Sequence, residues 1–328
     1  MTKLRLSLAI GDYEHTRDLA TGDVRAEGID LSISRVPIES LLFRFLRYKE
    51  WDVAEMGLGP YASLLSRGET GMVGIPVFPS RMFRHSSLYL RADAGIVHPS
   101  DLAGKRIGYA EWAMTAAVYA RAVLQEEGGL DLRSVQWVQG GVDQAGRVDK
   151  MNLDLPGYLI RHEPTQSLSD MLLSGELDAV ISARPPAPFL NGDLRVRRAW
   201  PDFFQTELLY WKRREIFPIM HLVVIRREIY ERDPWIAKNL LDAFEQAKQR
   251  SLARLRDMTV SGFPVPWLSH HIDFIQQEFG QDFWPYGIDP NLTTLDAFCD
   301  FAYEQGVCAR RLKPQELFAE STHLQSRI

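Results

Sequence analysis

Short apolar runs alternate with segments of helical periodicity along the whole chain. This alternation predicts an α/β protein with parallel strands, rather than a sandwich or a helical bundle. The apolar runs predict strands at residues 4–9, 31–36, 52–56, 72–77, 87–91, 106–109, 135–138, 179–182 and 221–226. Helical periodicity predicts helices at residues 38–48, 61–65, 116–126, 169–173, 234–256 and 292–305.

The order of these elements predicts two lobes. Two extended stretches, at residues 86–91 and 217–224, are expected to cross from one lobe to the other. The first lobe would then comprise residues 1–90 and 220–328, and the second lobe residues 91–219. Such a plan leaves a cleft between the lobes, and clefts between domains are common binding sites for small ligands.

Charge and hydropathy exclude several classes of partner. The 328 residues carry 38 Lys and Arg against 43 Asp and Glu, a net charge of -5, which is not expected of a protein that binds nucleic acid or an anionic membrane. No apolar run approaches the roughly 20 residues of a membrane span. The short apolar run at 4–10 ends at Gly11, so no export signal is expected. With Cys299 and Cys308 expected to be unbridged, we predict a cytoplasmic protein.

Two phrases in the middle of the chain resemble the type II periplasmic-binding-protein fold. They are Asp101-Leu-Ala-Gly-Lys-Arg-Ile-Gly, which opens the second lobe, and Leu173-Ser-Gly-Glu-Leu-Asp-Ala-Val, near its end. The resemblance implies a two-lobed α/β fold with two crossover strands and a central cleft. Because this fold carries both solute-binding proteins and enzymes, it does not by itself specify a function.

More specific phrases resemble the 4,5-dihydroxyphthalate decarboxylase family and are spread over nearly the whole chain. They are Gly11-Asp-Tyr-Glu-His-Thr-Arg, Asp52-Val-Ala-Glu-Met, Ile75-Pro-Val-Phe-Pro-Ser-Arg-Met-Phe-Arg-His-Ser, Met114-Thr-Ala and Phe217-Pro-Ile-Met-His-Leu-Val-Val. The resemblance implies a non-oxidative carboxy-lyase that acts on an aromatic or phenolic dicarboxylate similar to 4,5-dihydroxyphthalate. Protonation of the ring and loss of carbon dioxide would be its reaction.

This chemistry needs a general acid near the ring, a hydrogen-bond acceptor at the phenol and cations for the carboxylates. Histidine suits the proton transfer because its ordinary pKa is about 6.5. His15 follows the first predicted strand, at the end where parallel sheets bind ligands, and Asp12 and Tyr13 precede it. We expect His15 to transfer a proton and the other two to contact the substrate. Alternatively, the segment only shapes a turn.

A basic segment follows the fourth predicted strand. It contains Ser80, Arg81, Arg84 and His85, interleaved with Met and Phe. Guanidinium groups bind carboxylates bidentately, so we expect both arginines and Ser80 to contact the substrate and His85 to transfer a proton. The alternative is a solvated basic loop.

Four further positions are candidates. Thr115 is predicted to cap the helix that follows it, where free N–H groups would attract a carboxylate. Glu55 ends a strand and would accept from a phenol or orient a histidine, or would simply be exposed. His221 lies in an apolar run and would support catalysis, or would be a satisfied core residue. Arg184, before two prolines, would be a third cationic contact or part of a surface turn.

No cofactor is predicted. Gly57-Leu-Gly59-Pro-Tyr-Ala62 matches GxGxxA, but Pro60 stands inside the glycine turn and no acidic residue follows at the spacing that a ribose needs. Scattered histidines and carboxylates leave a divalent-metal site open, since such sites need no local motif.

The expected partner is a small aromatic carboxylate, and homo-oligomerisation stays open. Two rival functions also remain. One is a solute-binding protein for a small carboxylate, which would normally need an export signal. The other is a different aromatic-acid enzyme on the same fold, for instance one resembling those of the futalosine route to menaquinone.

Overall fold

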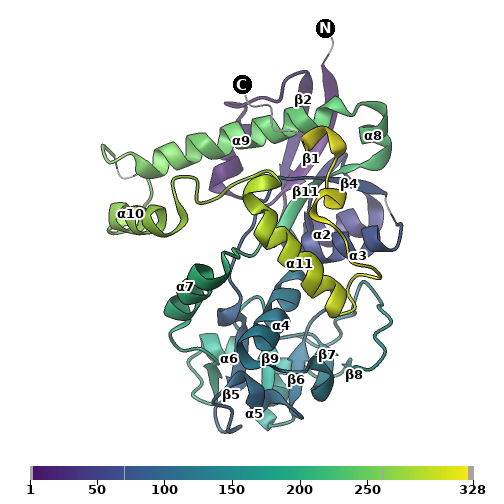
Figure 1. The fold of residues 1–328 in the computed structure, drawn as a ribbon, viewed down its shortest axis with the longest axis vertical. Helices are drawn as coiled ribbons and strands as arrows, with labels where there is room; N and C mark the ends of the chain where they lie inside the picture. Colours follow the sequence, from purple (N-terminus) through teal and green to yellow (C-terminus); the bar gives the residue numbers. More distant parts are fainter. Residues whose placement is uncertain (1–2, 70, 261, 324–328) are drawn as a thin grey trace.

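Two β-sheets lie at opposite ends of the molecule in the computed structural model, which describes residues 3–69, 71–260 and 262–323 (Figure 1). The first sheet has the strand order β2-β1-β3-β11-β4, with bounds Ile29–Arg35, Leu4–Ile10, Val53–Gly57, His221–Arg226 and Met72–Ile75. The second has the order β10-β5-β9-β6-β7-β8, with bounds Val196–Arg198, Leu88–Arg91, Ala179–Ile181, Arg106–Tyr109, Gln136–Gly140 and Leu159–Glu163. The predicted two-lobed α/β fold class is confirmed.

The returning strand β11 is central to the first sheet. β1 pairs in parallel with β2 and β3, whereas β11 runs antiparallel between β3 and β4. Residues Leu222 to Ile225 in the middle of β11 are fully buried, and this burial accounts for the uninterrupted apolar run in the sequence of the strand. The strand therefore carries His221, at its first position, directly to the end of the sheet that faces the second lobe.

Helices cover both sheets. Their bounds are α1 Arg17–Thr21, α2 Ile38–Tyr48, α3 Leu58–Ser66, α4 Thr115–Gly128, α5 Leu168–Ser174, α6 Ala187–Leu190, α7 Phe203–Arg214, α8 Arg227–Arg232, α9 Trp235–Arg256, α10 Leu268–Phe279 and α11 Leu292–Glu304. Helix α11 packs against α4 of the second lobe, where Arg121 Nε donates to Gln305 Oε1 at 2.9 Å (Figure 1). The lobes are thus held together by a helix contact as well as by the crossing segments. In the described ranges, no helix combines the length and the apolar character that crossing a membrane requires.

The predicted bounds of helices and strands are correct where burial of one face gives the apolar residues a clear periodicity. The elements at 38–48, 106–109 and 221–226 have the predicted bounds. The sequence analysis missed β8 and β10, which are the two edge strands of the second sheet. An edge strand buries less of its surface, so its apolar alternation is weak. It also missed α7 and α10, amphipathic helices with few buried residues.

The crossings lie a few residues from their predicted positions. Residues 88–91 already belong to the second sheet, and 221–224 belong to the first. The two crossing chains meet at an isolated antiparallel bridge between Arg81 and Ile219. The basic segment predicted to precede the crossing therefore forms part of it, and its side chains lie at the lobe boundary.

Candidate active site

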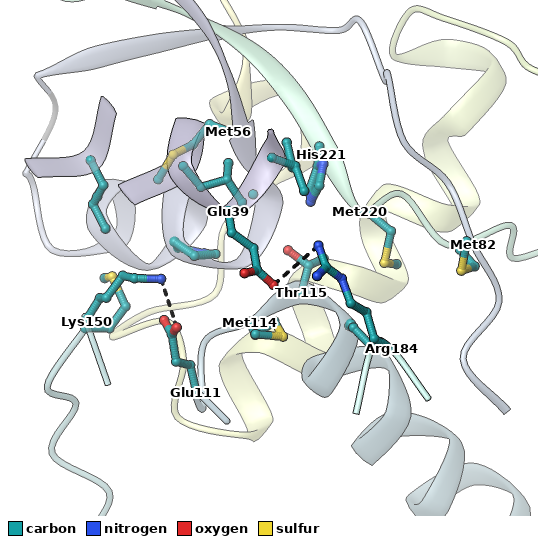
Figure 2. Close-up of a pocket in the computed structure, with 18 of the residues that line it drawn as sticks. Glu39, Met56, Met82, Glu111, Met114, Thr115, Lys150, Arg184, Met220 and His221 are labelled. Atoms are coloured by element: carbon teal, nitrogen blue, oxygen red, sulfur yellow. Dashed lines mark hydrogen bonds and ion pairs between the residues drawn. The ribbon is translucent and has the colours of Figure 1, made fainter. Parts of the chain in front are cut away.

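A cavity of about 330 Å³ lies between the lobes and is lined by both of them (Figure 2). The first lobe and the crossings supply Ile38, Glu39, Leu42, Leu46, Met56, Gly57, Pro60, Met82, Arg84, Met220 and His221. The second lobe supplies Glu111, Met114, Thr115, Ala116, Arg147, Lys150, Met151, Ala183 and Arg184. Its size suits a single aromatic ring with small substituents.

A histidine and a carboxylate form a pair at the wall of this cavity. In the register of β3 and β11, His221 lies opposite Gly57 and Glu55 lies opposite Val223. Side chains at diagonal positions of an antiparallel pair share a face of the sheet. His221 Nδ1 therefore lies 2.6 Å from Glu55 Oε1, above a glycine that leaves room for the ring.

Glu55 is fully buried and holds three donors. Oε2 accepts from the backbone N–H of Gly11 at 2.8 Å, and Oε1 accepts from the hydroxyl of Tyr13 at 2.6 Å as well as from His221. Burial and the neighbouring Glu55 carboxylate raise the pKa of Tyr13 well above 10, so this phenol stays a donor. An ionised carboxylate only accepts hydrogen bonds, so Nδ1 of His221 carries a proton and Nε2 is left for a ligand.

Arg84 is a buried cation that forms no ion pair with a carboxylate within 4 Å among the described residues, and Glu207 acts on it only at longer range. Its Nε contacts Met220 Sδ at 3.1 Å, and Nη1 makes two long contacts of 3.5 Å, with Ser87 Oγ and the carbonyl of Ala183. Burial lowers its pKa to about 10, which still leaves the guanidinium charged at neutral pH. A buried charge is costly unless it is paired, so this group is suited to an anionic ligand in the cavity that it lines.

Thr115 connects the two lobes. Its Oγ1 accepts from the backbone N–H of Gly59 at 2.9 Å. The predicted N-cap role is wrong by one residue, because Met114 is the N-cap and Thr115 is the first helical residue of α4. A Cβ on Gly59 would lie 2.1 Å from the carbonyl oxygen of Ala113, so the lobes can approach this closely only at a glycine.

The mouth of the cavity carries a weak ion pair between the lobes. Arg184 Nη2 lies 3.5 Å from Glu39 Oε1, and both side chains are mostly exposed (Figure 2). Exposed pairs of this kind contribute little to stability. Either group is therefore free to exchange its partner for a ligand.

The remaining walls of the cavity are apolar and include flexible methionine side chains. Five methionines line the cavity: Met56, Met82, Met114, Met151 and Met220. Thioethers adapt to irregular shapes and make favourable contacts with aromatic rings. An aromatic acid would thus find apolar surface for its ring and charged groups for its substituents.

A second polar group lies in the cavity, and the sequence analysis missed it. Glu111 Oε1 accepts from Arg147 Nη2 at 2.6 Å and from Lys150 Nζ at 2.9 Å. Both cations come from residues 141–158, a connection without helix or strand between β7 and β8. Connections this long are uncommon and are often functional, and that length was the signal that could have identified them.

His15 lies behind the pair rather than at the cavity. Its ring is 5.3 Å from that of Tyr13 and 5.5 Å from that of Trp284, and within the described chain its buried Nε2 has no hydrogen-bond partner. Burial lowers its pKa to about 4. Its predicted part in proton transfer stays a prediction.

His85 is also outside the cavity lining. It is buried against the rings of Trp200 and Tyr210, and its Nδ1 lies 3.9 Å from Glu207 Oε1. Burial lowers the pKa of His85 to about 4 and raises that of Glu207 to about 7. Its predicted proton transfer likewise stays a prediction.

Four other predicted substrate contacts are absent from the cavity lining, and one of them is Tyr13, whose hydroxyl is bound to Glu55. Arg81 is buried in the crossing, where Nη2 donates to the carbonyl of Pro285 at 2.8 Å and its side chain also bonds Asn291. The carbonyl of Ser80 accepts from the N–H of Met220 at 2.8 Å. Asp12 is exposed and pairs with Arg35. These contacts shape the crossing and the loop around the site, and the predicted contacts with substrate remain untested.

Metal-ligating side chains do not gather in the described part of the chain, where no group of three or more His, Cys, Asp or Glu could hold an ion. The prediction that no cofactor is needed remains a prediction.

Sequence comparison finds relatives of known activity. The chain is 38% identical over 320 residues to a 4,5-dihydroxyphthalate decarboxylase of Comamonas testosteroni, covering 97% of each chain. It is 42% identical over 204 residues to a 4,5-dihydroxyphthalate decarboxylase of Pseudomonas putida, covering 62% of this chain and 79% of the relative.

Structural comparison indicates the fold alone. The periplasmic aliphatic sulphonate-binding protein of Escherichia coli aligns with a TM-score of 0.52 at 14% identity, over 99% of this chain and 100% of that one. The NMT1/THI5-like family model matches residues 81–181, which include the crossing and much of the second lobe. At such low identity, the ligand of that binding protein says nothing about the ligand of this cavity.

Proposed function

Because the chain belongs to the 4,5-dihydroxyphthalate decarboxylase family, we propose that it is a carboxy-lyase that converts 4,5-dihydroxyphthalate to 3,4-dihydroxybenzoate and carbon dioxide. One observation carries the assignment of the site. The buried guanidinium of Arg84, which makes no ion pair within 4 Å in the described residues, lines the same cavity as an imidazole paired with a buried carboxylate.

Arg84 binds the carboxylate end of the substrate. Its Nε contacts the sulfur of Met220, the residue before His221, so the cation and the imidazole lie on adjoining parts of the wall. A carboxylate bound there brings the ring carbon that carries it toward His221. Thr115 and Arg184 also line the cavity, and we propose that they contact the second carboxylate.

His221 supplies the proton. In its protonated form it donates from Nε2 to the ring carbon that bears the leaving carboxylate, while Glu55 stabilises the imidazolium through Nδ1. The carbon–carbon bond to the carboxylate then breaks, its electron pair restores the aromatic ring, and carbon dioxide leaves. One proton replaces one carboxylate, and His221 recovers its proton from solvent.

The geometry favours His221 over the other two imidazoles as proton donor. His221 lines the cavity, whereas His15 and His85 do not. His15 packs on Tyr13, which donates to Glu55, so we propose that it helps to hold Tyr13 in place. We also propose a cytoplasmic location, supported by the free thiols of Cys299 and Cys308.

The test is turnover by the purified protein. Incubated with 4,5-dihydroxyphthalate, it should release carbon dioxide and 3,4-dihydroxybenzoate in equal amounts, with and without a chelator. His221→Asn should lower kcat at least about 100-fold, a typical effect of losing a general acid. His270→Asn, on the exposed face of α10, is the matched control and should keep full activity.

Other outcomes would overturn the proposal. Tight binding of 4,5-dihydroxyphthalate without any turnover would indicate a solute-binding protein. Turnover only of other aromatic acids would indicate a different enzyme on the same fold.

A further inference from the structure

Glu111, Arg147 and Lys150 form a second polar group in the cavity, which we call the far group. In Figure 2, Glu111 and Lys150 lie away from His221, with the side chain of Glu39 between them in this view. Met56 and Met114 also line the same cavity. Nothing in the chemistry of Arg84 and His221 described above uses the far group. Its position in the same cavity nevertheless places it within reach of the same ligand.

The far group is a built site rather than a set of loose surface charges. Glu111 is only 6% exposed. The loop that supplies the two cations is fixed by Asp149, whose carboxylate accepts from the N–H groups of Trp112 at 2.8 Å and Met151 at 3.0 Å. The carbonyl of Arg147 accepts from Gln139 Nε2 at 3.0 Å. These bonds hold the cations against Glu111 without a ligand.

Only one of the two carboxylate oxygens of Glu111 is hydrogen-bonded within the far group. Arg147 Nε and Nη2 and Lys150 Nζ all donate to Oε1 of Glu111, at 3.0, 2.6 and 2.9 Å. Within the described residues, Oε2 has no hydrogen bond and Lys150 has no second partner. Counted alone, these three side chains carry a net charge of +1, and the neighbouring Asp149 carboxylate is already engaged by two backbone N–H groups. The far group therefore offers one free acceptor beside excess positive charge.

This combination matches a hydroxyl group that is ready to ionise. A hydroxyl donates to Oε2, and its oxygen, once ionised, is stabilised by the two cations. A second carboxylate fits less well, because it has no proton to donate and would face the free oxygen of Glu111. The ligand chemistry indicated here is a catechol.

We propose that the far group binds the two ring hydroxyls of the substrate and stabilises the phenolate para to the departing carboxylate. The proposal rests on the proposed function. In 4,5-dihydroxyphthalate each hydroxyl lies para to a carboxylate, so a ring with its carboxylates at Arg84 directs its hydroxyls toward the opposite end of the cavity.

Every proton that moves in this step has a named donor and acceptor. The hydroxyl proton moves to Oε2 of Glu111, and the phenolate pushes electron density to the ring carbon that His221 protonates. After carbon dioxide leaves, the phenolate oxygen takes its proton back from Glu111. The far group thereby supplies the electron density that makes the ring carbon basic enough to accept a proton.

The test measures ionisation of the bound ring directly. The His221→Asn protein is mixed with 4,5-dihydroxyphthalate, and the long-wavelength absorption of the phenolate is followed against pH. Adding Lys150→Gln should raise the pH at which the bound phenol ionises by about one unit or more and weaken binding at least about tenfold. Lys150→Arg should largely restore both. Lys238→Gln, in a surface ion pair on α9, is the control and should change neither.

Phthalate, which lacks the hydroxyls, separates this role from general charge attraction. Its affinity should change less than about threefold in Lys150→Gln and in Glu111→Gln. Equal weakening of both ligands, or an unchanged phenolate absorption, would overturn the proposal. Failure of the proposed function looks different, because the protein without any substitution would then release no carbon dioxide from 4,5-dihydroxyphthalate.

Discussion

Nδ1 of His221 lies 2.6 Å from Oε1 of Glu55, although the two residues are 166 positions apart in the chain. The contact exists because β11 returns from the second lobe and inserts antiparallel beside β3. A carboxylate at this position fixes the ring orientation and selects the nitrogen that carries the proton. It also stabilises the imidazolium that would donate to the substrate.

Glu55→Gln should therefore lower kcat by about 100-fold or more while KM changes little. The amide keeps the shape of the side chain but loses the charge that stabilises a protonated His221. Steady-state kinetics at several substrate concentrations measures the effect. An unchanged kcat would remove this carboxylate from the mechanism.

Arg84→Gln should raise KM for the dicarboxylate by roughly 100-fold, because a charged hydrogen bond to a buried carboxylate is worth about 1.5 to 3 kcal/mol. Arg84→Lys should recover only part of the loss, since an ammonium cannot bind a carboxylate bidentately. Titration with phthalate and kinetics with 4,5-dihydroxyphthalate measure both variants. Arg5→Gln, at a side chain that is 91% exposed, is the control and should bind normally. Normal binding by Arg84→Gln would contradict the assignment.

Gly59→Ala should destabilise the protein and weaken ligand binding together. Its methyl group would lie 2.1 Å from the carbonyl oxygen of Ala113, so the lobes must move apart at the cavity. Overpacking of this kind costs about 1 to 3 kcal/mol. Thermal unfolding with and without phthalate measures both effects. Gly262→Ala, where a new Cβ would meet no atom of the described residues within 4 Å, should show neither.

His85→Gln should cost more stability at pH 7 than at pH 4.5. Burial lowers the pKa of His85 to about 4, so between pH 6.5 and 4 the unfolded chain binds more protons at this ring than the folded protein does. The neutral imidazole thus contributes stability above pH 6.5, and this contribution is lost as the pH falls. Removing the ring should reduce the difference between the two pH values by up to roughly 2 kcal/mol.

Urea unfolding of both proteins at the two pH values measures this change. Glu207, whose pKa burial raises to about 7, gives a dependence of the opposite sign, and subtracting the unsubstituted protein isolates the imidazole. The exposed His270→Gln is the control. An identical loss of stability at pH 7 and pH 4.5 would show that His85 does not titrate in this way.

The local pattern of apolar residues was sufficient to predict many of the helices and strands. Residues 38–48 and 221–226 were predicted with their observed bounds, because a helix face or a fully buried strand leaves a period or a continuous apolar run in the sequence. Edge strands such as β8 leave neither, and their pairing depends on a neighbour that folds far away in sequence. The predicted positions of the crossings are off by a few residues for the same reason, because they too depend on pairing with distant strands.

The sequence by itself determined that this is a two-lobed α/β protein with basic and imidazole groups near the lobe boundary, because strand and helix periods are local properties. Only the tertiary structure decided which of those groups share a cavity. The register between β3 and β11 brought His221 and Glu55 together. Arg81 is bonded within the crossing, whereas Arg84 lines the cavity. The loop after β7 added Arg147 and Lys150 beside Glu111. These outcomes depend on contacts between segments that are distant in the chain, and no local pattern encodes such contacts.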